Sequence, residues 1–150
     1  MTMLFKGESA MEEKTARLKN AVELAFMGDA VFETLVREHI TRNVDTNPNA
    51  LHRMAVGYVC AEAQSRALSH ILPLLTSDEL SIVRRGKNAS KVTAPRNVAP
   101  KTYREATAFE ALFGYLFLIG ENARINELFS AVVANHTEKE TAGNISPTVE

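Results

Sequence analysis

The chain has 150 residues, of which 45% are apolar and 23% charged, a composition typical of one globular domain rather than of a disordered chain. Its single cysteine, Cys60, excludes an internal disulfide and a cysteine-based zinc site. No apolar run reaches the ~20 residues that a membrane-spanning helix needs, and the first residues show no signal-peptide pattern. We therefore expect a cytoplasmic protein that has no membrane partner.

The formal net charge of −1 conceals an uneven distribution of basic residues. Segment 84–104 contains no acidic residue, and the rest of the chain is therefore strongly acidic. Its basic residues are Arg84, Arg85, Lys87, Lys91, Arg96, Lys101 and Arg104. Such a segment indicates either a surface for a polyanion such as nucleic acid or an ordinary solvated connection.

Apolar residues recur at helical spacing along most of the chain, and no alternating strand pattern is present, so the sequence predicts an all-α fold. Residues 14–41 predict one or two helices. Their apolar positions are Leu18, Val22, Ala25, Phe26, Val31, Leu35, Val36 and Ile40. Residues 51–75 predict two further helices, with a cap at Asn47 or Asn49, a break near residues 58–60 and an end near Pro73.

Two capping-box patterns mark the helices that follow. Thr76 to Glu79 predicts the start of a helix that stops at Gly86, and Thr102 to Glu105 predicts the start of one that stops at Gly120. Residues 87–100, between these helices, predict a loop that is long enough to be functional.

The two ends of the chain predict less order than its middle. Residues 122–135 predict a last amphipathic helix. Residues 1–13 and 137–150 predict flexible tails on a single domain that spans 14–136.

Two acidic residues, Asp29 and Glu110, lie in predicted helices that are otherwise mostly apolar. An unpaired carboxylate is costly to bury, so we expect both to be partly desolvated and to have partners. Each acid could pair with an arginine such as Arg37 or Arg104. Alternatively, both could converge on a hard divalent cation, for which Mg²⁺ is well suited because it takes one or two carboxylates.

Two glycines, Gly28 and Gly114, lie within about one helical turn of these acids. Glycine inside a helix costs about 1 kcal/mol relative to alanine, and a close crossing of two helices would offset that cost. Such a crossing would also bring the acids together. Glu33 could join them, but its spacing from Arg37 favours an ordinary i,i+4 ion pair.

Segment 24–33 (LAFMGDAVFE) resembles the signature helix of ribonuclease III catalytic domains, and segment 107–118 (TAFEALFGYLFL) resembles their second acidic motif. The chain is most similar to the short bacterial form of this family, Mini-ribonuclease III, which has no separate double-stranded-RNA-binding domain. Further similar blocks are 47–68, 84–90 and 95–112, so the resemblance covers about residues 19–133.

This resemblance implies a ribonuclease III-like helical bundle, a homodimer, and Mg²⁺-dependent cleavage of double-stranded RNA. It also implies a role in maturing the large-subunit (23S) ribosomal RNA precursor. Asp29 and Glu110 match the catalytic, metal-binding positions of the family. Ala25 and Thr107 stand where longer members have two further acids, so we expect one tightly held ion and weaker binding of a second.

In the reaction that these positions imply, a metal-activated water attacks the scissile phosphate and leaves a 5′ phosphate. The basic segment would hold the RNA by its A-form shape. Its candidate RNA-binding residues are Arg84, Arg85, Lys87, Asn88, Lys91, Arg96, Lys101 and Arg104. A ribosomal protein could act on the substrate first, and His52 could have a supporting role.

Two other interpretations of the sequence stay open. The first is a non-catalytic, ribosome-associated RNA-binding protein with a ribonuclease III-like fold. The second is a helical assembly protein whose basic loop binds an acidic protein surface. The presence of both Asp29 and Glu110 favours the enzyme, since a binding module has no need of carboxylates beside phosphate.

Overall fold

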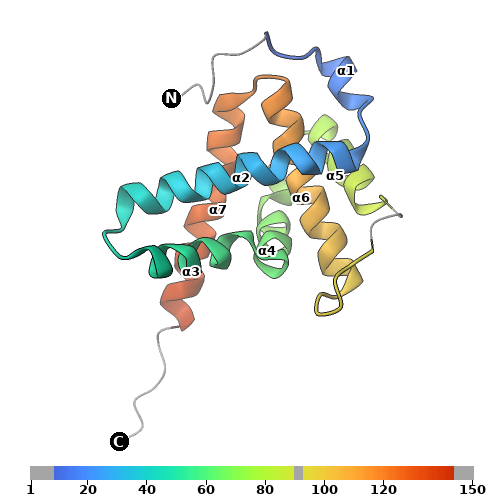
Figure 1. Ribbon diagram of the computed structural model, residues 1–150. Helices are drawn as coiled ribbons and strands as arrows, with labels where there is room; N and C mark the ends of the chain where they lie inside the picture. The colour runs from blue at the N-terminus through green and yellow to red at the C-terminus, as the bar shows by residue number, and fades with distance from the viewer. Residues whose placement is uncertain (1–8, 90–92, 144–150) are drawn as a thin grey trace, which may run out of the picture.

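The structure, a computed structural model, describes residues 9–89 and 93–143. Every regular element in these ranges is helical, which confirms the all-α prediction (Figure 1). The elements are α1 (Glu13–Arg17), α2 (Ala21–Asn43), α3 (Pro48–Val59), α4 (Ala61–Ile71), the 3₁₀ helix η1 (Leu72–Leu74), α5 (Ser77–Lys87), α6 (Pro100–Leu118) and α7 (Asn122–Gly143). None of these described helices is long and apolar enough to span a lipid bilayer.

Helices α2 and α6 form the centre of the molecule. They share the most extensive contact of any helix pair, and α6 also packs against α4, α5 and α7. Figure 1 shows α2 crossing α6. The rings of Phe32, Phe109 and Phe113 are buried at this centre, and the Phe32 ring lies 4.9 Å from that of Phe109 and 5.5 Å from that of Phe113.

The crossing of α2 and α6 depends on two glycines. A Cβ atom at Gly28 would overlap the carbonyl oxygen of Glu110, and one at Gly114 would overlap the carbonyl oxygen of Leu24. Backbone therefore touches backbone here, and no side chain fits at either position. The predicted close crossing is confirmed.

Most of the predicted helix ends are confirmed. Asn47 caps α3 by accepting a hydrogen bond from the Ala50 N–H (3.0 Å), and the break between α3 and α4 falls at Cys60. Thr76 and Glu79 form both bonds of a capping box at the start of α5. Gly120, with φ of 77°, follows the end of α6 in a conformation that favours glycine.

Two predicted helix ends are wrong. Helix α5 continues through Gly86 to Lys87, because Gly86 packs closely on α6: a Cβ there would lie 2.6 Å from the Ala108 Cα. Helix α6 begins at Pro100, which suits the first turn, and the residue before it provides no side-chain cap. Glu105 instead accepts a hydrogen bond from the Ser65 hydroxyl of α4 (2.5 Å).

At both ends of the described chain, regular structure or hydrogen bonding extends past the predicted boundaries. Helix α7 runs to Gly143, past the expected helix end at residue 135 and past the expected tail boundary at 137. The Met11 N–H donates to the Leu118 carbonyl (2.8 Å), so part of the predicted N-terminal tail is attached to α6. Residues 1–8 and 144–150 of the two predicted tails lie outside the described residues.

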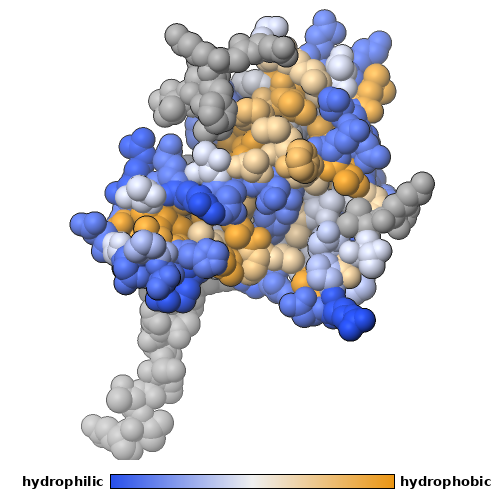
Figure 2. All heavy atoms as spheres, viewed as in Figure 1, coloured by the Kyte–Doolittle hydropathy of each residue, from blue (hydrophilic) through white to orange (hydrophobic). Residues whose placement is uncertain are grey.

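Three of the apolar positions in the helical pattern of residues 14–41 are exposed. Leu18, Val22 and Phe26 face solvent, and Phe26 is 84% exposed. Leu18 lies in the connection between α1 and α2, and Val22 and Phe26 lie off the face of α2 that carries Leu24 and Gly28 and packs on α6. Figure 2 shows apolar residues gathered beside α2 on the face turned to the viewer.

Candidate active site

One pocket, of about 350 Å³, holds both of the predicted acids. Asp29 reaches it from α2 and Glu110 from α6, while Gln64 lines it from α4. Because Gly28 precedes Asp29 and contacts the backbone of Glu110, the helix crossing itself brings the two carboxylates to the same place. The predicted convergence of Asp29 and Glu110 is confirmed.

Glu110 lies in the more buried part of this pocket. Burial raises the pKa of its carboxyl to about 8, with the negative charge of Asp29 as the second cause, while a hydrogen bond from Gln64 acts in the opposite direction. Two nearby carboxylates disfavour each other's charged forms in this way. Glu110 is therefore an acid whose charge requires a compensating partner.

Asp29 is exposed, which corrects the expectation that both acids are desolvated. Helix α2 presents this residue at the solvent side of the pocket, next to the exposed Phe26. Its position makes the pocket asymmetric, because one carboxylate is half-buried and the other is open to water.

The expected arginine partners do not pair with these acids among the described ion pairs. Arg37 instead bonds Glu33 (2.9 Å), which confirms the i,i+4 pair predicted for Glu33. Arg104 is exposed, and no described ion pair involves it. The interpretation of Asp29 and Glu110 as parts of structural ion pairs is therefore not supported by the described part of the chain.

The donor set of the pocket fits a hard divalent cation. It offers carboxylate oxygens from two helices, and no Lys, Arg or His is among the described residues that line it. No group of three or more His, Cys, Asp or Glu side chains suited to a metal occurs within the described residues. A cation held here would keep coordination positions for water or substrate oxygens, as Mg²⁺ commonly does.

Gln64 is the residue of this pocket that the sequence analysis missed. Its side chain is 2% exposed and lines the pocket with Glu110, where the amide acts to lower the pKa of the Glu110 carboxyl. The signal in the sequence was a glutamine on the buried face of α4, where Ala67 and Leu68 are its buried neighbours. Ala25 and Thr107, the two positions where the resemblance to longer family members implies further acids, also line the pocket.

The basic segment lies at the surface, and its residues have unequal surroundings. Arg84 and Asn88 are exposed at the end of α5, where Lys87 is half-buried. Arg85 donates hydrogen bonds to the backbone carbonyls of Arg17 and Lys19, the latter at 2.6 Å, and so ties α5 to the connection between α1 and α2.

The remaining basic positions follow the loop that connects α5 and α6. Arg96 is exposed in this loop, and Lys101 and Arg104 are exposed in the first turns of α6. Lys101 makes a long ion pair with Glu105 (3.9 Å). Lys91 lies outside the described residues.

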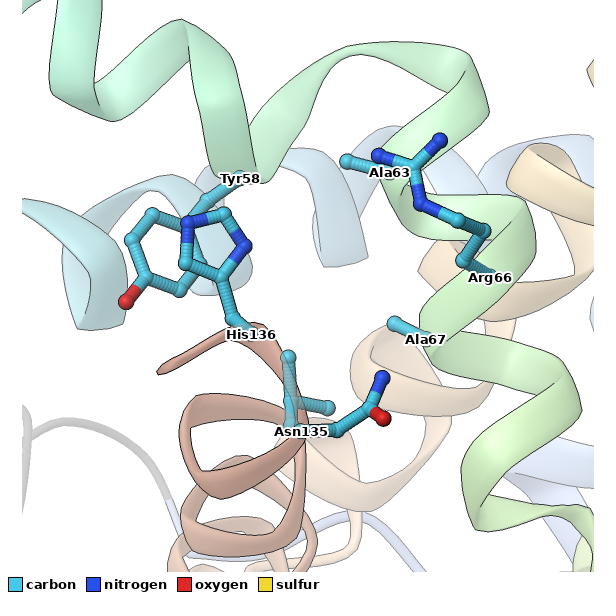
Figure 3. Close-up of a pocket in the computed structure, with 7 residues that line it drawn as sticks. Tyr58, Ala63, Arg66, Ala67, Asn135 and His136 are labelled. Carbon is cyan, nitrogen blue, oxygen red and sulfur yellow. The ribbon is translucent and has the colours of Figure 1, made fainter. Parts of the chain in front are cut away.

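Two other pockets carry no carboxylate. One, of about 200 Å³, lies between α4 and α7; Figure 3 shows Arg66 and Asn135 at its sides, with the His136 ring stacked on that of Tyr58. The other is lined by His52 and Arg37 and shares no lining residue with the acid pocket. His52 therefore does not line the pocket that holds the two acids.

Comparisons with known proteins agree with this geometry. A family model described as the ribonuclease III domain matches residues 22–121, a range that contains both acids. A Mini-ribonuclease 3 from Symbiobacterium thermophilum is 44% identical over 72% of this chain and 83% of its own. One from Clostridium tetani is 34% identical over 92% of this chain and 91% of its own.

A solved structure shows the same fold. The crystal structure of a protein from Fusobacterium nucleatum superposes with a TM-score of 0.73 at 30% sequence identity. The match covers 79% of this chain and 95% of that protein. The fold of this chain is thus shared along nearly the whole length of the other molecule.

Proposed function

Because this chain belongs to the ribonuclease III family, in its short Mini-ribonuclease 3 form, it is an endoribonuclease, and we propose that it cleaves double-stranded RNA with Mg²⁺ as cofactor. The observation that carries this proposal is the convergence of Asp29 and Glu110 in one pocket. The substrate we propose is the precursor of large-subunit (23S) ribosomal RNA in the cytoplasm, with a ribosomal protein as a further partner on that substrate.

The two carboxylates would hold the cation, which supplies charge neutralisation at the scissile phosphate and lowers the pKa of the attacking water. Without a counter-charge they would repel the phosphate that they must act on. Asp29, on the exposed side, is accessible to a bulky duplex, whereas Glu110 is fixed more deeply. Hydrolysis in this arrangement leaves a 5′ phosphate on the product.

The basic segment would bind the sugar-phosphate backbone. Charges at the end of α5 and at the start of α6 suit recognition of A-form RNA by shape rather than by base sequence. The proposed RNA contacts are Arg84, Lys87, Asn88, Lys91, Arg96, Lys101 and Arg104. Because the guanidinium of Arg85 is engaged with backbone carbonyls, we assign that residue a structural role.

We further propose a homodimer. Phe26 lines the acid pocket and is 84% exposed, with Leu18 and Val22 exposed nearby along the chain. A large aromatic side chain in water is a common sign of a subunit contact. A dimer would place two acid pockets on one duplex, one for each strand. Light scattering tests this, and we expect Phe26→Asp to convert a dimer to a monomer.

The test of the activity uses the full-length chain with structured duplex RNA. We expect cleavage with Mg²⁺, none with chelator, and products that carry 5′ phosphates. Cleavage of a 23S precursor at discrete positions, with and without large-subunit ribosomal proteins, tests the substrate. Binding without cleavage would favour the non-catalytic RNA-binding protein, and absence of both would favour the assembly protein.

A further inference from the structure

Two polar side chains are buried among the described residues, and only one of them is explained by the fold. Glu79 bonds Arg124 through both carboxylate oxygens (2.8 and 2.9 Å) and completes the cap of α5. Gln64 takes part in no cap, and its side chain lines the acid pocket. The fold gives this buried amide no structural role, so its interaction with Glu110 is the remaining explanation for its burial.

An apolar residue would serve the packing of α4 at position 64 equally well. The neighbouring buried positions of this helix are alanine, leucine and isoleucine. A buried amide adds nothing to such a face and costs roughly 1–3 kcal/mol unless it is hydrogen-bonded. Here the amide lies in the same pocket as Glu110, and an N–H donated to that carboxylate offsets the cost.

Three polar side chains of the pocket differ in how exposed they are to solvent. Gln64 is buried at 2% exposure, Glu110 is half-buried, and Asp29 is exposed. A carboxylate has two oxygens, and a donor on its buried side can engage one while the other stays available to the pocket. The amide is also neutral, so it can orient Glu110 without competing with a cation, as a lysine or arginine would.

We propose that Gln64 is a positioning residue that holds the Glu110 carboxylate in the orientation needed for divalent-cation binding, an inference that rests on the function proposed above. The side chains that hold metal ligands in place commonly contribute 10–100-fold to metal affinity or activity. Because Asp29 and Glu110 are the only carboxylates among the described residues that line this pocket, the orientation of each has a large effect on what the pocket can bind.

The principal test replaces Gln64 with methionine, which is close in size and cannot donate a hydrogen bond. We expect Gln64→Met to weaken Mg²⁺ binding, measured by calorimetry on the protein alone, by about 10–100-fold. Cleavage should then recover at high Mg²⁺, and duplex binding in chelator should stay within about twofold. Unchanged Mg²⁺ affinity in a folded variant would overturn the proposal.

A matched control and a coupling test separate positioning from packing. Ser65→Ala removes the hydrogen bond of the neighbouring residue to Glu105, outside the acid pocket, and should leave Mg²⁺ affinity unchanged. In a Glu110→Ala background, Gln64→Met should cause no further loss. A further loss in that background would show that Gln64 does not act through Glu110.

A measurement on the unaltered protein covers the case in which Gln64→Met does not fold. Gln64 is the only glutamine in the sequence, so selective ¹⁵N labelling gives one side-chain amide pair. We expect this resonance to shift on Mg²⁺ addition with the affinity found by calorimetry, and not to shift in Glu110→Ala. If the protein binds Mg²⁺ and cleaves RNA but the resonance does not shift, only the role of Gln64 is overturned. If the protein neither binds Mg²⁺ nor cleaves RNA, the proposed function is overturned as well.

Discussion

The acid pocket and the basic segment differ in how the fold supports them. Asp29 and Glu110 lie on two helices whose backbones touch at Gly28 and Gly114, so the relative position of the carboxylates is fixed by the centre of the protein. The basic side chains lie at a helix end, in a loop and in the first turns of α6, mostly exposed. Catalytic groups need fixed geometry, whereas phosphate binding depends mainly on charge.

The largest effect expected is from Asp29→Asn, which preserves the size of the side chain and removes its charge. Loss of several kcal/mol of metal-dependent stabilisation corresponds to about a thousandfold slower cleavage or more. Binding of duplex RNA should change little, since the basic segment is untouched. Single-turnover cleavage and a binding assay in chelator check both statements, and near-normal cleavage would refute the assignment of Asp29.

The next effect tests the backbone contact between α2 and α6 that fixes the acid pocket. Gly28→Ala places a methyl group on the Glu110 carbonyl oxygen, so we expect a loss of folding stability of about 3 kcal/mol or more, at the upper end for overpacking. Gly57→Ala is the control, because its Cβ would meet only the His136 Cε1 at 3.9 Å. That control should be neutral or stabilising by up to about 1 kcal/mol. Equal melting temperatures of the two variants would contradict the crossing.

The pH dependence of stability distinguishes the buried acid from the exposed charges. In the metal-free protein the pKa of Glu110 is raised from 4.5 to about 8, so the folded state binds this proton more tightly than the unfolded chain does. The contribution of this proton to the free energy of unfolding is present in full below pH 4.5. It is lost as the pH rises through about 8. Melting temperatures between pH 5 and 8.5 in chelator measure it.

Two variants and one ligand sharpen that measurement. Glu110→Gln should remove this contribution to the pH dependence, and Asp29→Asn should reduce it, because the charge of Asp29 is one of its causes. Mg²⁺ should bind more tightly as the pH rises, since it competes with the proton. A pH profile that is the same in Glu110→Gln and the unaltered protein would contradict the burial of this acid.

The smallest effect concerns the basic segment. Arg84→Ala and Lys87→Ala should each lower the slope of log binding constant against log salt by up to about 0.9, the value for one phosphate contact on a duplex. Arg85→Ala is the control: it should leave the slope unchanged and lower stability by roughly 1–3 kcal/mol through the lost bonds to Arg17 and Lys19. A slope that falls only for Arg85→Ala would reverse these assignments.

How far the sequence predicts the molecule differs between these two regions. Charges inside apolar helices, with a glycine close to each, were enough to place Asp29 and Glu110 together, because few arrangements bury such segments. Gln64 was missed because its role depends on α4 packing beside α6, which no local pattern encodes. The same tertiary packing made Gly86 a contact with Ala108 rather than a helix end.

Exposure was the less predictable property. Phe26 has the spacing of a core residue and yet faces solvent, because the first half of α2 is covered on one side only. The pattern of a sequence gives the apolar face of a helix, but not how much of that face a neighbour reaches. In the basic segment, charge alone could not distinguish Arg85, which bonds the backbone, from the exposed Arg84.

The described residues between α5 and α6, 88–89 and 93–99, lie outside the contact of α2 with α6. Residues can therefore be inserted, removed or exchanged there without displacing either carboxylate. On the RNA contacts proposed for this connection, changes there alter how RNA is bound while the two carboxylates keep their positions. Exchanging this connection between relatives is accordingly a practical route to enzymes of altered selectivity.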